Sequence, residues 1–253
     1  MPVRGAGHSV GSMSSLPQHG RSASSRAENV AIVTGGSRGL GRALAGGLAA
    51  AGWRVVIDGR DADALAQARW DLPSDTVAVA GDITDPAHRT ALVDAAGDRV
   101  DLLVNNAGIL GPSPQPDLAS YPVAALREVY EVNVVAPLAL TQLALPALRA
   151  ARGSLVMITS DASVEPYEGW GGYGSAKAAV DQLSRVLAVE ELALRVWAVD
   201  PGDLRTRMHQ EAFPGEDISD RPLPETVVPA FLRLLADRPA SGRVRLADLA
   251  VAA

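Results

Sequence analysis

The residues with the clearest capacity for chemistry are a tyrosine and a lysine in the stretch YEGWGGYGSAK, residues 167–177. Tyr173 and Lys177 are four residues apart, close to one helical turn, so a helix that begins near Gly172 would project both side chains from one face. A neighbouring ammonium favours the phenolate, and we therefore expect Lys177 to lower the pKa of Tyr173 from about 10 toward neutral pH. Such a pair predicts general acid–base chemistry at the phenol.

The composition limits the partners of this chemistry. The 253 residues are 47% hydrophobic and 21% charged, as in a soluble globular protein. The net charge of −6 argues against a nucleic-acid partner, and no run of about 18 apolar residues predicts a membrane span. The chain has no cysteine, which excludes disulfides and thiolate metal sites and suits a reducing cytoplasm. Its four histidines are scattered, so we expect no metal site and a small-molecule substrate.

The N-terminal segment differs in composition from the remainder. Residues 1–28 are rich in Ser, Gly, Ala and Arg and lack apolar periodicity, which predicts a disordered tail. A transit peptide is an alternative, because the segment is Arg- and Ser-rich and almost free of acids. Residues 29–253 show no internal linker and are expected to form a single domain.

From residue 29 the chain alternates short β-branched runs with longer Ala- and Leu-rich stretches. The runs predict strands at residues 29–36, 54–59, 76–82, 101–108, 153–160 and 194–202. The stretches predict helices at residues 39–51, 61–69, 86–96, 120–148 and 172–191. This alternation indicates an α/β fold: a Rossmann-type, doubly wound parallel sheet with helices on both faces. Such sheets bind ligands at the carboxyl ends of their strands, where the strand order reverses.

The first of these strand ends is rich in glycine. The strand runs directly into TGGSRGLGRALA, residues 34–45, with a helix following at once. Gly35, Gly39 and Gly41 allow the backbone to approach a pyrophosphate, and the N-terminus of the helix offers free N–H groups to hold it. The position of the motif between a strand and a helix predicts a nucleotide site.

Further motifs follow in order: NNAG (105–108), Asn133 within EVNVVAP, Ser160 thirteen residues before Tyr173, and PGDLRT (201–206). Each has an ordinary reading by itself, as a turn former, a helix kink or a cap. Together with the glycine spacing TGxxxGxG and the Tyr-x-x-x-Lys pair, they resemble the short-chain dehydrogenase/reductase family over residues 29–207. The resemblance implies a nicotinamide-dependent oxidoreductase that forms homodimers or homotetramers through its two long helices.

The resemblance also implies a role for each residue of the site. Tyr173 would protonate a carbonyl oxygen that Ser160 holds, Lys177 would grip the nicotinamide ribose, and Asn133 would hold a water that relays protons. The residues expected to contact the dinucleotide are Gly35, Ser37, Arg38, Gly39, Leu40, Gly41, Arg60, Asp82, Ile83, Asn106, Ala107, Gly108, Tyr173, Lys177, Pro201, Gly202 and Thr206.

The stretch RVVIDGRDAD, residues 54–63, bears on the choice between NAD(H) and NADP(H). An acid at the end of the second strand reads the ribose 2′-hydroxyl, whereas an arginine reads a 2′-phosphate. Asp58 could be such an acid. In the family, however, the discriminating acid usually falls where this chain has Gly59, and Arg60 follows as in NADP-dependent members. With Arg38 in the glycine turn, two arginines could bind the phosphate, so we expect NADP(H). The alternative is that both arginines are solvated surface charges.

The substrate is less well specified. The stretch PYEGW (166–170) and the short connection at Glu190 and Glu191 are similar to sepiapterin reductases, one subgroup of the family. Those enzymes anchor the pterin by a carboxylate near the C-terminus, where this chain has Leu246. Asp248, two residues on, would share the face of Leu246 in a strand. Pterin reduction is therefore an alternative to reduction of another small ketone or aldehyde, or to the reverse oxidation.

The segment 203–224 is long, polar and interrupted by proline, which predicts a lid over the substrate. From position alone we expect Tyr167, Trp170, Met208 and Phe213 to line the substrate pocket. A non-catalytic regulator that senses the dinucleotide is a further alternative, although such proteins typically lose the tyrosine or the lysine.

Overall fold

A parallel sheet forms the centre of the part of the chain that the computed structural model describes, residues 1–3, 5, 29–73 and 75–249. Within these residues, seven strands pair in the order β3-β2-β1-β4-β5-β6-β7. The strands are β1 (Val30–Val33), β2 (Arg54–Gly59), β3 (Val77–Ala80), β4 (Leu102–Asn105), β5 (Ser154–Ile158), β6 (Arg195–Asp200) and β7 (Gly242–Arg245). The predicted doubly wound parallel sheet is confirmed. Apart from residues 1–3 and 5, the tail predicted for residues 1–28 lies outside the described residues.

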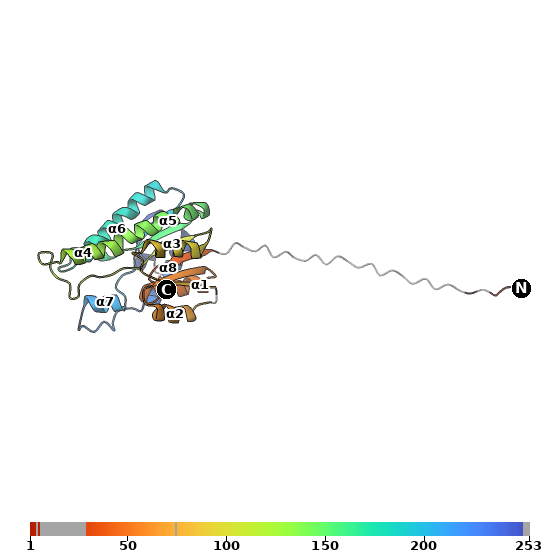
Figure 1. Cartoon of the computed structure of the whole chain (residues 1–253), viewed down its shortest axis with the longest axis horizontal. Coiled ribbons are helices and arrows are strands. Elements are labelled where there is room, and N and C mark those ends of the chain that lie inside the picture. Colours follow the sequence, from red (N-terminus) through yellow and green to blue (C-terminus); the bar gives the residue numbers. More distant parts are fainter. Residues whose placement is uncertain (4, 6–28, 74, 250–253) are drawn as a thin grey trace.

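Alternation of side chains along the strands builds two apolar layers. In β1, Ala31 and Val33 join the core cluster on one face, whereas Val30 and Ile32 join the cluster on the other. Helices α1 (Gly39–Ala50), α2 (Ala62–Trp70) and α8 (Val228–Asp237) cover the first face. Helices α3 (Pro86–Ala96), α5 (Ala136–Ala151) and α6 (Gly171–Glu190) cover the second. Figure 1 shows α3, α5 and α6 on the opposite side of the sheet from α1 and α2.

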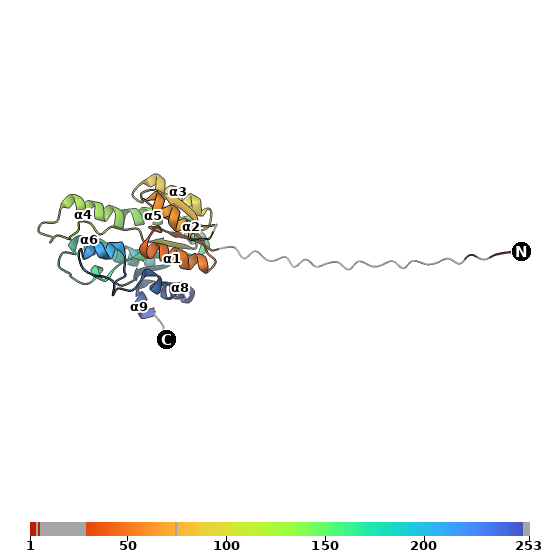
Figure 2. The same ribbon diagram turned by 90° about the horizontal axis from the view of Figure 1, so that it is seen from below.

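Short elements complete the fold. They are α4 (Val123–Tyr130), the π-helical turn η1 (Glu131–Val135), the 3₁₀ turns η2 (Asp161–Ser163) and η3 (Pro224–Val227), α7 (Arg207–Ala212) and α9 (Leu246–Leu249). The helix predicted at 120–148 is thus interrupted by η1. Seen from below, α9 lies beside α8 near the C-terminal end of the described chain (Figure 2).

Local signals in the sequence explain several helix starts. The Asp61 carboxylate accepts a hydrogen bond from the Ala64 N–H at 3.0 Å and caps α2. Asp85 caps α3 in the same way through the Ala87 N–H at 2.9 Å, and Pro86 fills the first helical position, where no N–H is needed. These caps begin both helices directly after the ends of β2 and β3, where a ligand site is expected.

One helical stretch is long and apolar enough to cross a membrane by length and composition alone. It is Val123–Ala151, which comprises α4, η1 and α5. Core helices of soluble proteins pass the same test, and α5 packs Leu140, Ala144 and Leu148 against the sheet. Asn133 and other polar residues interrupt the apolar run, which is why the sequence did not predict a span there. The stretch is therefore weak evidence for a membrane location.

Candidate active site

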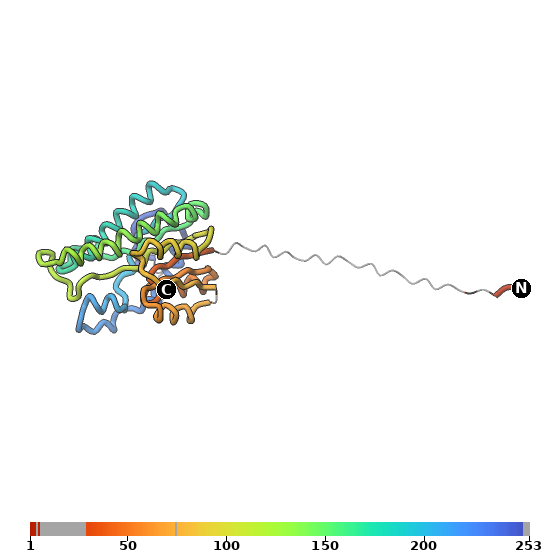
Figure 3. Tube along the Cα trace, in the orientation of Figure 1, coloured from red at the N-terminus to blue at the C-terminus, as the bar shows by residue number. Residues whose placement is uncertain are grey.

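The predicted site residues gather at the carboxyl ends of the strands. The order of the sheet reverses between β1 and β4, so the glycine turn that follows β1 lies next to the loop that follows β4. At the same end, α7 lies beside the loop after β4 (Figure 3). The Ser113 hydroxyl in that loop donates a hydrogen bond to the Glu211 carbonyl of α7 at 2.5 Å. The glycine turn, the loop after β4 and the segment that carries α7 therefore lie at one edge of the sheet.

The glycine turn is tied to the loop after β4 by hydrogen bonds. The Thr34 hydroxyl oxygen accepts N–H groups from Asn106 and Ala107 at 3.0 and 2.9 Å, and the Asn106 amide donates to the Thr34 carbonyl at 2.7 Å. A Cβ atom at Gly41 would lie 2.5 Å from that amide nitrogen. Gly35 adopts a φ of +68°, a conformation that favours glycine. These contacts explain why the turn is built from glycine.

The N-terminus of α1 is open to an anion. Arg38 is the N-cap residue and its side chain makes no capping hydrogen bond, which leaves the first N–H groups of the helix available. Ser37 is buried beside Gly59, and Leu40 packs against the core below the turn. A Cβ at Gly39 would lie 3.5 Å from the Thr206 methyl, so the turn faces the segment after β6.

Asp58 is not available to a ribose. Its side chain is 3% exposed, one oxygen accepts the Gly35 N–H at 2.6 Å, and the other lies 3.0 Å from His88 Nε2. This pair holds the glycine turn against α3. The alternative in which Asp58 reads the 2′-hydroxyl is therefore wrong.

Two exposed ion pairs flank the end of β2. Arg38 Nη2 lies 2.9 Å from an Asp61 oxygen, and Arg60 Nη1 lies 4.0 Å from an Asp82 oxygen. Asp82 also accepts the N–H and hydroxyl of Thr84 at 2.9 and 2.8 Å, which shapes the loop toward α3. The following residue, Ile83, is buried. Beside this loop lies a cavity of about 390 Å³, lined by Arg60, Asp82, Thr84, Arg127, Glu128, Glu131 and Val132.

Tyr173 and Lys177 lie on the first turns of α6, as predicted, and both are buried. Lys177 Nζ is 5.4 Å from the centre of the Tyr173 ring and donates a hydrogen bond to the Ile158 carbonyl at 2.8 Å. Burial raises the pKa of Tyr173, and the carboxylates of Asp161 and Asp200 raise it further. Burial also lowers the pKa of Lys177 to about 8, although Asp181 opposes that shift.

The expectation that Lys177 lowers the pKa of Tyr173 is therefore wrong for this structure. The ammonium lies over the ring face and is directed at a backbone carbonyl, while burial disfavours the phenolate. The phenol is consequently held in its protonated form, and the lysine is the member of the pair whose pKa moves toward neutral pH.

Ser160 follows β5 and carries a neighbour that the sequence analysis did not select. The Ser160 hydroxyl donates to Asp161 at 2.9 Å, and the other Asp161 oxygen accepts the Tyr167 hydroxyl at 2.9 Å. Ala162 packs in one apolar cluster with Tyr173, which brings the Ser160 loop and the phenol to the same part of the site. An acid directly after the serine was the signal that could have identified Asp161.

Asn133 lies in the π-helical turn η1, a feature often found at functional sites. Its amide oxygen accepts the Ile109 N–H at 3.1 Å and its amide nitrogen donates to the Ile109 carbonyl at 2.8 Å. A Cβ at Gly108 would lie 2.5 Å from the Asn133 oxygen. The side chain thus binds the loop after β4, and its role in holding a water stays a prediction.

The four residues predicted to line the substrate pocket are brought together around Tyr173. The Trp170 ring lies 6.3 Å from Tyr167, 5.9 Å from Tyr173 and 5.9 Å from Phe213. Met208 packs against the same cluster as Tyr173 and Trp170. The rings and the thioether therefore form one wall beside the phenol.

The segment 203–224 contains a helix that the sequence did not predict. Thr206 caps α7 by accepting the His209 N–H at 3.1 Å, and the Arg205 N–H donates to the Pro222 carbonyl at 2.8 Å, which closes the segment on itself. Before it, Pro201 leads into Gly202, which has a φ of +75° and donates its N–H to Asp200 at 3.0 Å.

The C-terminal region differs from the sequence expectation. Leu246 and Asp248 do not share a strand, because β7 ends at Arg245 and Leu246–Leu249 form α9. Leu246 is buried in the core, whereas Asp248 is exposed. Within the described ranges, no group of three or more His, Asp or Glu side chains could hold a metal ion.

Known proteins share both the sequence and the fold. The family profile described as short chain dehydrogenase matches residues 29–217. A 3-oxoacyl-[acyl-carrier-protein] reductase of rhamnolipid biosynthesis from Pseudomonas aeruginosa is 38% identical, over 73% of this chain and 76% of that protein. Sepiapterin reductase from Rattus norvegicus is 34% identical, over 72% of this chain and 77% of that protein.

A solved short chain dehydrogenase from Shigella flexneri, complexed with NADP, superposes with a TM-score of 0.78 at 29% identity. The match covers 86% of this chain and 95% of that one. The matching profile spans the residues that carry these motifs. The chain therefore belongs to the short-chain dehydrogenase/reductase family of nicotinamide-dependent oxidoreductases.

Proposed function

We propose that this protein is an NADPH-dependent reductase that converts a ketone or aldehyde of a small organic molecule to an alcohol, or catalyses the reverse oxidation. The observation that carries the proposal is the buried Tyr173–Lys177 pair on α6, packed beside the Ser160 loop at the carboxyl edge of the sheet. A protonated phenol in that position suits proton donation to a carbonyl oxygen.

Each side chain has one task in this reaction. A bound nicotinamide would supply the hydride. The Tyr173 hydroxyl donates its proton to the substrate oxygen, and the Ser160 hydroxyl, released from Asp161, stabilises the negative charge that develops there. Lys177, with a pKa lowered to about 8, would hold a ribose hydroxyl of the dinucleotide in place of the Ile158 carbonyl, and it can return a proton toward Tyr173. Asn133 keeps the loop after β4 in place.

The residues present fit a dinucleotide with a 2′-phosphate. Gly35, Gly39 and Gly41 keep the turn open to a pyrophosphate, and the uncapped N-terminus of α1 offers its N–H groups. Asp58 is engaged with His88, which removes the acid that would favour NAD(H). Arg38 and Arg60 are exposed and would exchange their present carboxylate partners for the phosphate.

The other residues predicted to contact the cofactor support a dinucleotide at the same edge of the sheet. The cavity lined by Arg60 and Asp82 suits the adenosine end, and Ile83 is buried next to Asp82. Asn106, Ala107 and Gly108 would border the middle of the dinucleotide. Pro201, Gly202 and Thr206 would border the nicotinamide end, and Thr206 also lies close to Gly39 of the glycine turn. The segment 203–224, with α7 and Met208, is then the lid over the substrate.

The substrate wall favours an apolar or flat group next to the carbonyl. Trp170 touches three other aromatic rings, and its neighbours Tyr167 and Phe213 border the same space. The pterin alternative lacks its anchoring carboxylate, because Leu246 is buried in the core and the Asp248 carboxylate is exposed on α9. A small ketone without a guanidine-like edge is the better candidate.

The decisive experiment compares the parent with Tyr173→Phe by absorbance at the nicotinamide band, across a panel of vicinal diketones, other ketones and pterins. We expect kcat/KM to fall by about 100- to 10,000-fold while the Kd of NADPH is unchanged. Tyr130→Phe, on α4, is the matched control and retains full activity. Equal rates in the parent and Tyr173→Phe would contradict the proposal. A parent that binds NADPH but oxidises it with none of the carbonyls in the panel would favour the regulator.

Two further features stay predictions of the sequence. Location in the cytoplasm is supported by the absence of cysteine, and assembly into a homodimer or homotetramer by the family resemblance.

A further inference from the structure

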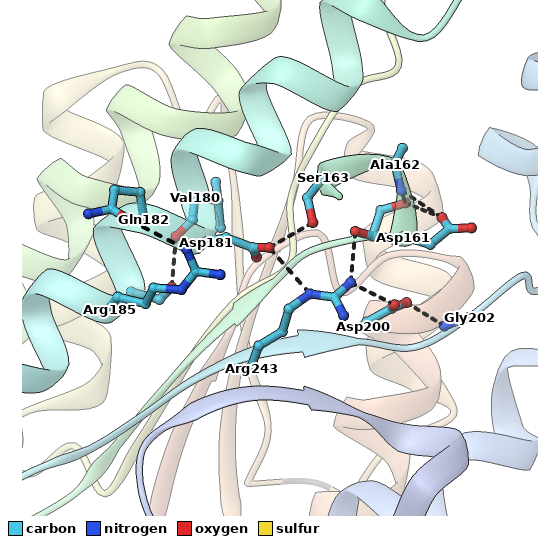
Figure 4. Close-up of polar contacts among 12 residues, drawn as sticks. Asp161, Ala162, Ser163, Val180, Asp181, Gln182, Arg185, Asp200, Gly202 and Arg243 are labelled. Atoms are coloured by element: carbon cyan, nitrogen blue, oxygen red, sulfur yellow. Dashed lines mark hydrogen bonds and ion pairs between the residues drawn. The ribbon is translucent and has the colours of Figure 1, made fainter. Parts of the chain in front are cut away.

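Arg243 on β7 joins three elements of the proposed reaction site. Its Nη2 atom donates hydrogen bonds to the Ser160 carbonyl at 3.1 Å and to an Asp200 oxygen at 2.9 Å. Its Nε atom lies 3.3 Å from an Asp181 oxygen. Figure 4 shows the guanidinium between Asp181 of α6 and Asp200 at the end of β6. Ser160 follows the end of β5.

The two carboxylates that face Arg243 reach on toward the reacting residues. Asp181 lies one helical turn after Lys177 and accepts the Ser163 hydroxyl at 2.7 Å. Asp200 accepts the Gly202 N–H at 3.0 Å, at the turn that borders the nicotinamide end. Arg243 therefore contacts, directly or through one carboxylate, the backbone on both sides of the site (Figure 4).

These carboxylates are buried, so their charge must be balanced nearby. The side chains of Asp181 and Asp200 are 4% and 5% exposed. An unpaired charge at such depth is costly, and removal of one partner leaves the other uncompensated. Arg243 is the cation that touches both of them.

The Tyr173–Lys177 pair senses the same charges. Asp181 raises the pKa of Lys177 against the effect of burial, and Asp200 contributes to the raised pKa of Tyr173. The charged groups that act on the pair come from three elements: Asp181 on α6, Asp161 on η2 and Asp200 on β6. Arg243 on β7 contacts two of these carboxylates.

We propose that Arg243 is a positioning residue of the reaction site, which clamps the Ser160 loop, α6 and the turn after β6 together and balances the two buried carboxylates beside the Tyr173–Lys177 pair. The inference rests on the proposed function for the roles of Ser160, Tyr173 and Lys177. Its geometry suits arginine, because a planar guanidinium can donate in several fixed directions at once, whereas a lysine ammonium lacks that fork.

The charge balance can be measured without a substrate. The chain contains a single lysine among its 23 basic residues, so a protein labelled with ¹³C at the lysine ε-carbon reports the titration of Lys177 alone. In Arg243→Gln the Asp181 carboxylate loses its partner and acts more strongly on the ammonium. The pKa of Lys177 then rises by about half a unit or more. In Asp181→Asn the carboxylate is gone, and the pKa falls by a similar amount.

A merely structural role would not produce opposite shifts in these two variants. Arg245→Gln, on the same strand and exposed, removes the same charge as Arg243→Gln and leaves the titration unchanged. Identical titrations of the parent, Arg243→Gln and Asp181→Asn would overturn the charge balance.

The clamp is tested separately by amide hydrogen exchange. We expect Arg243→Gln and Arg243→Lys to speed exchange in residues 160–164 and 201–204. Unchanged exchange in both variants would overturn the clamp.

With any carbonyl that the parent reduces, kcat falls by about 10- to 100-fold in Arg243→Gln while the KM for NADPH is retained. A parent that reduces no carbonyl defeats the proposed function, whereas the titration and the exchange still decide the role of Arg243.

Discussion

The two ends of the carboxyl edge are held together by different kinds of interaction. At the nucleotide end, the glycine turn is fixed by hydrogen bonds in which each donor has an acceptor: Thr34 with Asn106, and Gly35 with Asp58. At the reaction end, Lys177 lies over the Tyr173 ring, and the carboxylates of Asp161 and Asp200 act on the phenol. Three buried polar atoms at or next to that end, Thr159 Oγ1, Asp181 Oδ1 and Arg243 Nε, have no hydrogen-bond partner among the described residues, whereas the nucleotide end has one such atom, Asn105 Oδ1 at the end of β4.

The difference indicates which region is a scaffold and which region does chemistry. Fully paired polar groups fix a single geometry, and disturbing them costs free energy of folding. Groups with shifted pKa values and unused hydrogen-bonding capacity can change partner or protonation state during a reaction. The nucleotide end therefore preforms a site, and the reaction end keeps Lys177 and Ser160 able to change partners.

The choice of basic residues follows the same division. The chain contains 22 arginines and one lysine, which is Lys177. Arginine stays charged at all ordinary pH values, whereas burial can bring a lysine pKa close to neutral. Arg38, Arg60 and Arg243 form ion pairs, and the one basic side chain that can release a proton lies beside the phenol.

The largest expected effect comes from a substitution in the glycine turn, where the polar groups are hydrogen-bonded to one another. A Cβ at Gly41 would meet the Gly35 carbonyl and the Asn106 amide, so Gly41→Ala must displace the turn. We expect NADPH affinity to fall by about 100-fold and the free energy of unfolding by about 1–3 kcal/mol. Gly46→Ala on the same helix meets only Leu72 at 3.8 Å and should add about 0.5–1 kcal/mol of stability. Fluorescence titration and urea unfolding measure both; equal behaviour of the two variants would contradict a tightly packed turn.

The reaction end should respond to pH instead. Lys177 has a pKa of about 8 in the folded protein and 10.5 in the reference state. Between these values the unfolded chain binds more protons than the folded one, so this residue makes the protein more stable as pH rises. From about pH 7.5 to about pH 9.5, the parent should gain about 2 kcal/mol in free energy of unfolding relative to Lys177→Met. Parallel pH dependence of the parent and the variant, in urea unfolding, would show that Lys177 titrates normally.

The sequence predicted the nucleotide end more completely than the reaction end, for a physical reason. Glycine spacing, strand ends and the Tyr-x-x-x-Lys interval are local features, and they place the turn, α6 and the two motif residues correctly. The direction of the pKa shift of Tyr173 was predicted wrongly, because burial and the charges of Asp161 and Asp200 depend on how distant segments pack.

The missed elements were those without a local pattern. Strand β7 has four residues, GRVR, with little apolar alternation, so neither the strand nor the role of Arg243 could be read from it. Asp181 lies within the predicted helix 172–191, and its burial beside Arg243 follows only from the packing of α6 against the sheet. Asp58 at a strand end matched the position of a ribose reader, and only its partner His88, 30 residues later, assigns it to the scaffold.

The smallest expected effects concern the two exposed ion pairs at the nucleotide end. Arg60→Gln removes a cation that lies only 4.0 Å from Asp82, and we expect the Kd of NADPH to rise by about 10-fold with little change for NADH. Asp61→Asn keeps a residue that can cap α2 but releases Arg38, so NADPH binding should tighten. Arg99→Gln, before β4 at the opposite edge of the sheet, removes the same charge as Arg60→Gln and leaves both affinities unchanged. An equal loss of NADPH and NADH affinity in Arg60→Gln would mean that this arginine shapes the loop and does not read a 2′-phosphate.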